Sequence, residues 1–187
     1  MPRALMLTGD AAEELDVMYP LYRIREAGWD VDVAALTRRD VQLVVHDFDP
    51  NSDAYTEKNG RKLPVDLAFS EVEVERYSAL VIPGGRAPEY IRTDAHVRRI
   101  TEYFFEKDLP VGTICHGPQV PAVYGLLRGR KTAAFPPLHG DMENAGATIV
   151  DEPDCVDGNM VSCRGWPDMP DWSRAFMTVL ERAAVPA

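Results

Sequence analysis

The apolar positions of this chain fall into two kinds of pattern, which alternate along its length. Short strand-like runs occupy residues 3–7, 30–36, 41–45, 79–82 and 109–114, with further strand at 147–151 and 154–163. Between them lie segments whose apolar residues recur at close to helical spacing, at 13–28, 95–108, 118–127 and 172–183. The spacing therefore predicts strands and helices that follow one another through the chain.

This alternation is typical of a parallel sheet that carries helices on both of its faces. In such folds, ligand sites form beyond the carboxyl ends of the strands. Two turns fall at such ends, the Gly84-Gly85 pair after one predicted strand and Cys115 after another. We therefore expect a single α/β domain over the whole chain, with its site at these two turns.

Residues 46–64 interrupt the alternation with a polar stretch that contains Pro, Asn and Gly. A loop of this length in a compact domain is often a lid or a specificity element, so we expect a lid-like loop here. The stretch opens like a calcium-binding loop, but Ser52 and Lys58 stand where that loop needs Gly and Glu. No cysteine and histidine cluster has the spacing of a zinc site, and we predict no metal and no cofactor.

The overall composition favours a globular enzyme or binding protein over several other classes. The chain has 187 residues, 45% of them hydrophobic, and a formal net charge of −10, which makes nucleic acid a poor partner. No apolar run is long enough to span a membrane, and the first one is too short for a signal peptide. Three cysteines without a secretion signal indicate free thiols, so we expect a cytoplasmic protein.

Cys115 is the residue that most suggests chemistry, because it lies where a predicted strand gives way to a predicted helix. A nucleophile at such a junction sits on a sharp turn, and a small neighbour such as Gly117 relieves the crowding. The start of the following helix favours the thiolate, which is already nucleophilic. The alternative is a buried structural cysteine beside a turn, and the junction favours the functional interpretation.

The other cysteines and histidines suggest less. Cys155 and Cys163 flank a predicted turn, and we expect them to pack as small apolar residues. The remaining histidines that do not adjoin Cys115 are expected in loops or at the surface; they are His46, His96 and His139.

Four stretches of the chain together resemble the ThiJ/PfpI family, namely VIPGGRAPEYIR, TICHGPQV, LRGRKTAAFP and VDGNMVSCRGWPDMPDW. This superfamily includes the parkinsonism-associated deglycase and the PfpI intracellular protease, and it is related to class I glutamine amidotransferases. The resemblance covers nearly all of the chain. It implies a flavodoxin-like three-layer sandwich, with a mostly parallel sheet and helices on both faces.

The resemblance also implies roles for residues at the predicted turns. Cys115 would be the nucleophile, and His116 would supply the imidazole beside it. The backbone amides of Gly85 and His116 would form the oxyanion hole, which suits amides that point at developing negative charge.

Two acids complete the site that the resemblance implies. A glutamate after the first strand hydrogen-bonds the cysteine sulfur, and the register places it at Glu13, with Glu14 as the competing choice. Glu89 would orient the imidazole of a neighbouring subunit, so we expect a homodimer or a larger homo-oligomer. Phe135 stands where some branches carry a histidine or a tyrosine. Trp166 would either wall the substrate pocket or pack as an interface aromatic.

These features favour a cofactor-free cysteine enzyme that acts on a small electrophile, such as a carbonyl, amide or nitrile compound. Glyoxalase, hydratase and amidase reactions all begin with addition of a thiolate to such a carbon. Two alternatives stay open, an intracellular cysteine peptidase of the PfpI type and a non-enzymatic redox or stress sensor that uses oxidation of Cys115. The sequence does not choose the substrate.

Overall fold

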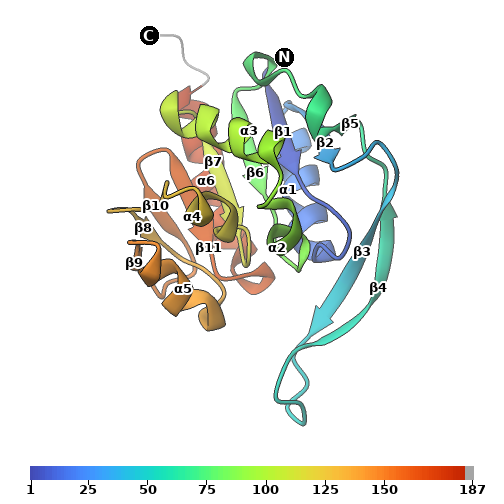
Figure 1. The fold of residues 1–187 in the computed structure, drawn as a ribbon, viewed down its shortest axis with the longest axis vertical. Helices are drawn as coiled ribbons and strands as arrows, with labels where there is room; N and C mark the ends of the chain where they lie inside the picture. The colour runs from blue at the N-terminus through green and yellow to red at the C-terminus, as the bar shows by residue number, and fades with distance from the viewer. Residues whose placement is uncertain (184–187) are drawn as a thin grey trace.

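A computed structural model describes residues 1–183, and its centre is a seven-stranded sheet with the order β10-β11-β7-β6-β1-β2-β5 (Figure 1). Every neighbouring pair in this sheet is parallel except β10 and β11, which are antiparallel. The strands are β1 (Arg3–Leu7), β2 (Asp30–Ala35), β5 (Leu67–Ala68), β6 (Ala79–Ile82), β7 (Val111–Ile114), β10 (Cys155–Asp157) and β11 (Met160–Cys163).

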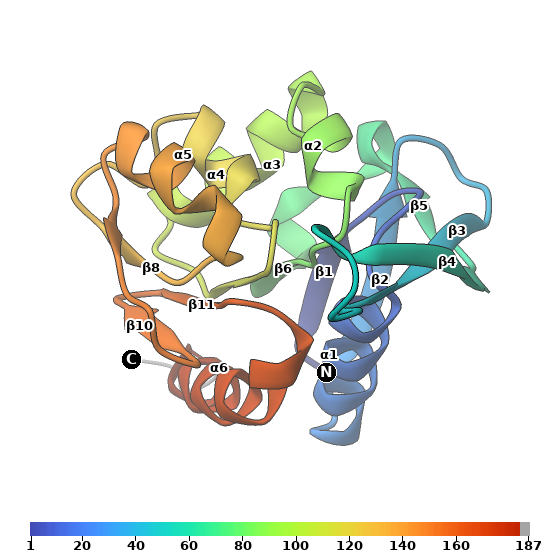
Figure 2. The ribbon, with the colours of Figure 1, turned by 90° about the horizontal axis from the view of Figure 1, so that it is seen from below.

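Helices cover both faces of the sheet, so the predicted sandwich is confirmed (Figure 2). One face carries α1 (Glu14–Glu26) and α6 (Met169–Ala183), which also contact each other. The other face carries α2 (Ala87–Ile91), α3 (Ala95–Glu106), α4 (Gln119–Val123) and α5 (His139–Asn144). Three of these helices, α2, α4 and α5, are short, and α4 spans only the first half of the helix that the spacing predicts at 118–127.

Strand β1 lies inside the sheet, between β6 and β2, and its position explains why its residues are apolar without alternation. Ala4 and Met6 belong to the core cluster that contains the buried residues of α1 and α6, whereas Leu5 and Leu7 belong to the cluster that contains those of α3. A strand covered on both faces needs apolar side chains at every position. The same arrangement buries all four residues of β6 and all four of β7, and so it holds the turns at Gly84-Gly85 and Cys115 on a rigid support.

The interpretation of residues 46–64 as a lid-like loop is wrong for most of its length. Residues of β3 (Val41–Asp47) pair antiparallel with β4 (Thr56–Leu63), from Val41 opposite Leu63 to Asp47 opposite Thr56. The two strands form a hairpin outside the main sheet, which projects at the lower right of Figure 1. Most side chains of β4 are exposed, so this strand has no apolar face and its sequence pattern is that of a loop.

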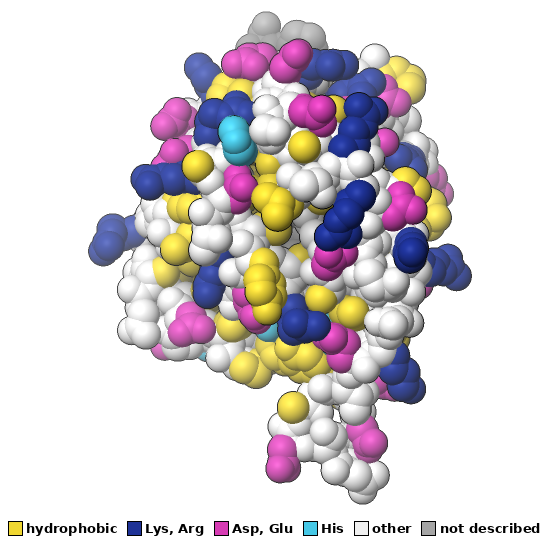
Figure 3. Space-filling view, turned by 45° about the vertical axis from the view of Figure 1, so that its right-hand side comes forward, with side chains coloured by type: hydrophobic (Ala, Val, Ile, Leu, Met, Phe, Trp, Pro, Cys, Tyr) yellow, Lys and Arg dark blue, Asp and Glu magenta, His cyan; other side chains and the backbone are white. Residues whose placement is uncertain are grey.

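The remaining elements are short. Two-residue strands β8 (Lys131–Thr132) and β9 (Thr148–Ile149) pair with each other, and four single 3-10 turns lie at 69–71, 74–76, 136–138 and 166–168. On the face in Figure 3, acidic and basic side chains are interspersed above the projecting hairpin. No helix within residues 1–183 is long and apolar enough to cross a membrane.

Candidate active site

Cys115 sits on a strained turn directly after β7. Its φ of 58° lies in the left-handed region, which is uncommon for a residue with a side chain. Two backbone hydrogen bonds hold it there, from the Cys115 amide to the Cys163 carbonyl at 3.0 Å and from the Phe135 amide to the Cys115 carbonyl at 3.1 Å. A Cβ at Gly117 would lie 2.1 Å from the Ile82 carbonyl oxygen, so only glycine lets the chain turn this sharply.

The Cys115 sulfur faces a ring nitrogen and two backbone amides. Sγ lies 3.2 Å from Nδ1 of His116, and the side chain is 4% exposed. Burial raises the pKa of the thiol, and a negative charge on Asp16 would raise it further. The amides of Gly85 and His116 act in the opposite direction, because both point at the sulfur and favour its anion. The structure thus brings together Cys115, the imidazole of His116 and the two amides that the sequence prediction names.

The acid beside the sulfur is Asp16, a residue of α1 that the sequence analysis did not select. A Cβ at Gly84 would lie 2.5 Å from Asp16 Oδ2 and 2.5 Å from Cys115 Cβ, so the carboxyl group and the cysteine face each other across that glycine. Asp16 is fully buried, and neither of its oxygens has a partner of good hydrogen-bond geometry. Burial raises its pKa well above the ordinary value, and the nearby charge of Glu13 adds to this. Burial therefore favours the neutral, protonated form of this carboxyl group.

The prediction that Glu13 or Glu14 bonds the sulfur is wrong. Glu13 caps the start of α1, where Oε1 accepts a hydrogen bond from the Leu15 amide at 3.2 Å and Oε2 accepts one from the His46 amide at 2.7 Å. Glu14 accepts a hydrogen bond from the Arg61 amide at 2.6 Å. Both carboxylates therefore tie α1 to the hairpin. Asp16, which lies one helical turn after Glu13, faces the sulfur instead.

His46 was expected in a loop or at the surface, but it is buried in β3 within a chain of charged groups. Its Nδ1 lies 3.3 Å from Glu13 Oε2, and its Nε2 lies 2.9 Å from Glu57 Oε2. Glu57 accepts two further hydrogen bonds from Arg86, at 2.8 and 2.7 Å. The Arg86 guanidinium, and to a smaller extent His46, lowers the pKa of Glu57 to about 2. This chain of contacts fixes the tip end of the hairpin to the loop that contains Gly85.

Aromatic side chains from three parts of the chain enclose the site. The ring of His116 stacks on Phe135 with centroids 5.0 Å apart, and Tyr55 meets the same histidine edge-on at 6.3 Å. Phe48, at the tip of the hairpin, stacks on Trp166 at 5.1 Å. The hairpin tip therefore covers the site in the way that the predicted lid would, although it is carried by paired strands.

Cys115 opens onto a cavity of about 340 Å³ with mostly apolar walls. Its wall residues include Phe48, Phe135, Trp166 and the adjoining Pro136 and Pro137. A second hollow, of about 620 Å³, shares Phe48, Phe135 and Pro137 and extends beneath the hairpin tip to His116. The structure thus places both Phe135 and Trp166 against the cavity that Cys115 lines.

Arg164 lies on the rim of the smaller cavity and is already paired. Its guanidinium donates to Asp168 at 2.8 and 3.1 Å and to Asp151 at 2.9 Å. A substrate in this cavity would therefore be held mainly by apolar and aromatic contacts. Within residues 1–183, no group of three or more His, Cys, Asp or Glu side chains is arranged as a metal site.

Glu89 lies on α2 and does not reach His116 in the single chain. Its side chain is half-buried, and within residues 1–183 it forms no hydrogen bond or ion pair. Its charge lies close enough to Tyr55 to add to the effect of burial, which raises the pKa of that phenol. The partner subunit that the sequence prediction requires is not part of the structure, so the role of Glu89 stays a prediction.

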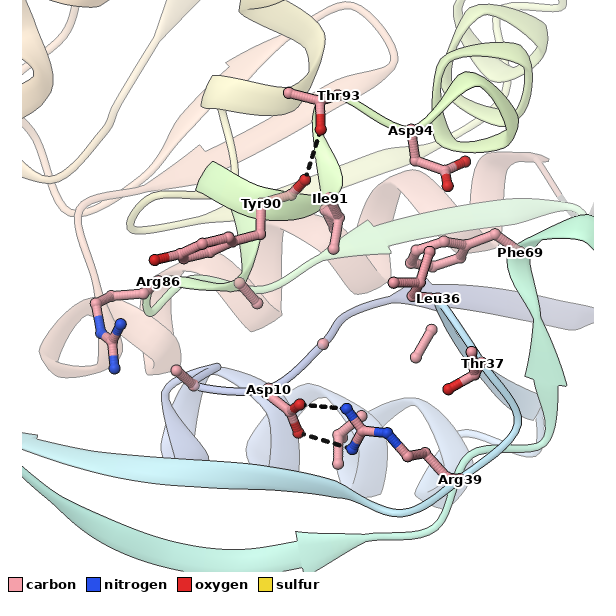
Figure 4. A pocket seen from close by; sticks show the side chains of 15 residues that line it. Asp10, Leu36, Thr37, Arg39, Phe69, Arg86, Tyr90, Ile91, Thr93 and Asp94 are labelled. Atoms are coloured by element: carbon pink, nitrogen blue, oxygen red, sulfur yellow. Dashed lines mark hydrogen bonds and ion pairs between the residues drawn. The ribbon is translucent and has the colours of Figure 1, made fainter.

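A separate cavity of about 600 Å³ lies beyond the carboxyl ends of β1 and β2, between α2 and the hairpin (Figure 4). Asp10 and Arg39 point at each other across its floor and form an ion pair, while Tyr90 and Ile91 project from α2. Cys115 does not line it. This cavity shares no lining residue with the cavity at Cys115, so the two are separate.

The sequence profile of the DJ-1/PfpI family matches residues 2–179. The chain belongs to the DJ-1/PfpI family. Among curated relatives, a deglycase of Thermococcus kodakarensis is 40% identical over 95% of this chain and 99% of its own length. The deglycase PfpI of Pyrococcus furiosus is 36% identical over 96% of this chain and 99% of its own. Protein DJ-1 homolog D of Arabidopsis thaliana is 35% identical over 95% of this chain and 47% of that protein.

Solved structures of other DJ-1/PfpI members share the fold. A two-domain protein of Anabaena variabilis, which has DJ-1/ThiJ/PfpI-like and ferritin-like domains, aligns with a TM-score of 0.83 and 27% identity over 100% of this chain and 50% of that chain. The oxidized DJ-1 of Toxoplasma gondii aligns with a TM-score of 0.80 and 23% identity over 98% of this chain and 94% of its own. The family and the fold predicted from the sequence are both confirmed.

Five residues of the site were missed at the level of sequence: Asp16, His46, Phe48, Tyr55 and Glu57. Only one signal in the sequence could have found any of them. Asp16 lies three residues after Glu13, so both can reach the same side of a helix start. The other four depend on the pairing of β3 with β4, which the exposed, polar sequence of β4 conceals.

Proposed function

We propose that this DJ-1/PfpI member is a cofactor-free cysteine enzyme that acts on a small carbonyl compound or a related electrophile. The observation that carries the proposal is the strained turn at Cys115, which aims its sulfur into a cavity beside His116 and the two amides. Relatives named deglycases, at 36% and 40% identity, support a substrate derived from a carbonyl compound.

The proposed first step is addition of Cys115 to the electrophilic carbon. A sulfur–carbon bond forms, the carbon–oxygen double bond becomes a single bond, and the thiol proton passes to Nδ1 of His116 at 3.2 Å. The new oxyanion accepts hydrogen bonds from the amides of Gly85 and His116. Protonation of the oxyanion by His116 then gives a hemithioacetal, from which hydratase, glyoxalase or deglycase outcomes diverge.

The cover over the site favours small substrates over peptides. Phe48 and Tyr55 descend from the hairpin tip onto Trp166 and His116, and the cavity at the sulfur measures about 340 Å³. A peptide needs an open groove on both sides of the scissile bond, and these stacked rings would obstruct one. The peptidase alternative is therefore the weaker of the two.

The proposed assembly is a homodimer or larger homo-oligomer in which Glu89 reaches His116 of the neighbouring chain. Support comes from its half-buried, unpaired side chain within residues 1–183 and from its place on a helix next to the hairpin tip. A carboxylate at the imidazole would steady the protonated ring after the thiol proton arrives.

A substrate panel tests the proposed function. Purified wild-type protein is incubated with small 2-oxoaldehydes, simple aldehydes, amides and nitriles, and separately with unfolded casein. We expect turnover within one small-molecule class and no casein cleavage, because the aromatic cover admits the former only. Casein cleavage with no small-molecule turnover would favour the peptidase, and no turnover in any class would contradict the proposal.

The pH dependence of His116 gives a second test. Burial, together with the nearby His46, lowers the pKa of His116 to about 4. A lowered pKa keeps the imidazole neutral, and thus able to accept a proton, at lower pH than an unperturbed histidine. In the isolated subunit we expect the ring protons of His116 to titrate in NMR with a midpoint near that value, with His116→Gln used for assignment. In an oligomer where Glu89 of the neighbouring chain faces the ring, we expect the midpoint at higher pH. A midpoint close to the ordinary value of about 6.5 would show that the ring is solvated or paired with a carboxylate.

The same lowered pKa affects stability. Unfolding releases His116 to its ordinary pKa, so the unfolded chain binds an extra proton between the two values. This contribution therefore destabilises the fold as pH falls from about 6.5 toward 4, and activity profiles need a circular dichroism check at each pH.

A further inference from the structure

A second buried thiol lies next to the nucleophile. Cys163 ends β11, and the parallel pairing of β11 with β7 sets it opposite Ile114, the residue before Cys115. The Cys115 amide donates to the Cys163 carbonyl at 3.0 Å. With standard bond lengths, this hydrogen bond keeps the two Cα atoms at most about 7 Å apart. That separation is within the range that a disulfide can bridge.

Both sulfurs lie on the same side of the sheet. The two cysteines belong to the one core cluster that the sheet forms with α1 and α6. Both sulfurs also lie close to Gly165. Cys163 Sγ is 3.8 Å from the Gly165 carbonyl oxygen, and a Cβ atom added to Gly165 would lie 3.9 Å from Cys115 Sγ. The Asp16 carboxyl group lies near both thiols, since a negative charge on it would raise the pKa of each.

Cys155 is excluded from this pair by the pleat of the sheet. It is paired across the β10–β11 ladder with Ser162, whose side chain points to the opposite face from that of the next residue, Cys163. Cys155 lies outside both core clusters. Cys155 is therefore directed away from Cys115, and it can be replaced without removing the proposed pair.

We propose that Cys163 is a resolving cysteine, which forms a disulfide with Cys115 after a hydroperoxide has oxidised the nucleophile. The inference does not rest on the proposed substrate. It rests on the placement of two buried thiols side by side, one of which opens onto a cavity that a small peroxide can enter.

The reaction has two steps. The Cys115 sulfur takes one oxygen from hydrogen peroxide to give the sulfenic acid, and the second peroxide oxygen leaves as water. The Cys163 sulfur then attacks the sulfenic sulfur, so a sulfur–sulfur bond forms and the sulfur–oxygen bond breaks. The hydroxyl group leaves with the Cys163 thiol proton as a second water. The disulfide blocks further oxidation to the sulfinic acid, and an added thiol reductant returns both cysteines to thiols.

Mass spectrometry of peroxide-treated protein tests the proposal. The experiment uses Cys155→Ser, since Cys155 and Cys163 share the tryptic peptide 132–164 while Cys115 lies in 108–128. After a limited dose of hydrogen peroxide, we expect a mass loss of about 2 Da and a cross-linked pair of these peptides. Adding Cys163→Ser to this protein should abolish the cross-link and give a gain of about 32 Da on peptide 108–128.

Controls keep the result interpretable. Cys163→Ala is measured beside Cys163→Ser, and both must retain the wild-type circular dichroism spectrum, since the site is fully buried. Reductant should restore the thiol mass in Cys155→Ser but not in the double variants. A sulfinic product on 108–128 at equal rates with and without Cys163, with no cross-link, would overturn the proposal.

Discussion

Cys115→Ala protein is expected to lose turnover of any substrate that the wild type accepts by at least about 10³-fold. In the proposed reaction the sulfur is the atom that forms the bond to substrate, and no other cysteine lines the described cavity. The oxyanion amides of Gly85 and His116 belong to the backbone and stay in place, so a small residual rate is expected rather than none. Substrate turnover and circular dichroism of the same preparations measure the effect.

The two other cysteines supply the controls for this prediction. Cys155→Ala and Cys163→Ala should each retain turnover within about threefold, since neither thiol lines the cavity that contains Cys115. Brief alkylation with iodoacetamide should label Cys115 first for the same reason. Preferential labelling of Cys155, or full activity in Cys115→Ala, would show that the nucleophile is a different group.

The parallel sheet could be predicted from sequence because its strands are covered on both faces. Runs such as 3–7 and 79–82 are apolar at every position, and the helices between them have helical spacing. The hairpin could not be predicted in the same way. The exposed strand β4 is held by backbone pairing to β3, and backbone pairing leaves no mark on side-chain pattern.

The site could be predicted where a residue is fixed by the backbone. Cys115, Gly85 and Gly117 occupy a strand end and tight turns, and such positions restrict residue type strongly. Asp16 was missed because the apolar residues of α1 indicate the wrong side of the helix as its buried face. Leu15 is 50% exposed although it fits helical spacing, whereas Asp16 beside it is fully buried.

Asp16→Ala is expected to lower turnover by about 10²-fold, the typical cost of removing one donor to a developing anion. Burial and the charge of Glu13 raise the pKa of Asp16 well above its ordinary value, which favours the neutral carboxylic acid. A neutral acid donates a hydrogen bond to the Cys115 thiolate, whereas an ionised one would repel it. Asp16→Asn keeps a neutral donor of the same size and should retain activity within about fivefold of the wild type.

The pKa of the Cys115 thiol, followed by ultraviolet absorbance or by alkylation rate, separates this role from a structural one. Asp16→Ala should raise that pKa because a donor to the thiolate is lost, and Asp16→Asn should leave it nearly unchanged. If Asp16 were ionised, both variants would instead lower the thiol pKa, since each would remove the negative charge that opposes the thiolate.

Glu13→Gln is the matched control. The Glu13 carboxyl group contacts the Leu15 and His46 amides, so this change should not move the thiol pKa as Asp16→Ala does. A shift in Glu13→Gln equal to that in Asp16→Ala would return Glu13 to the role that the sequence first suggested.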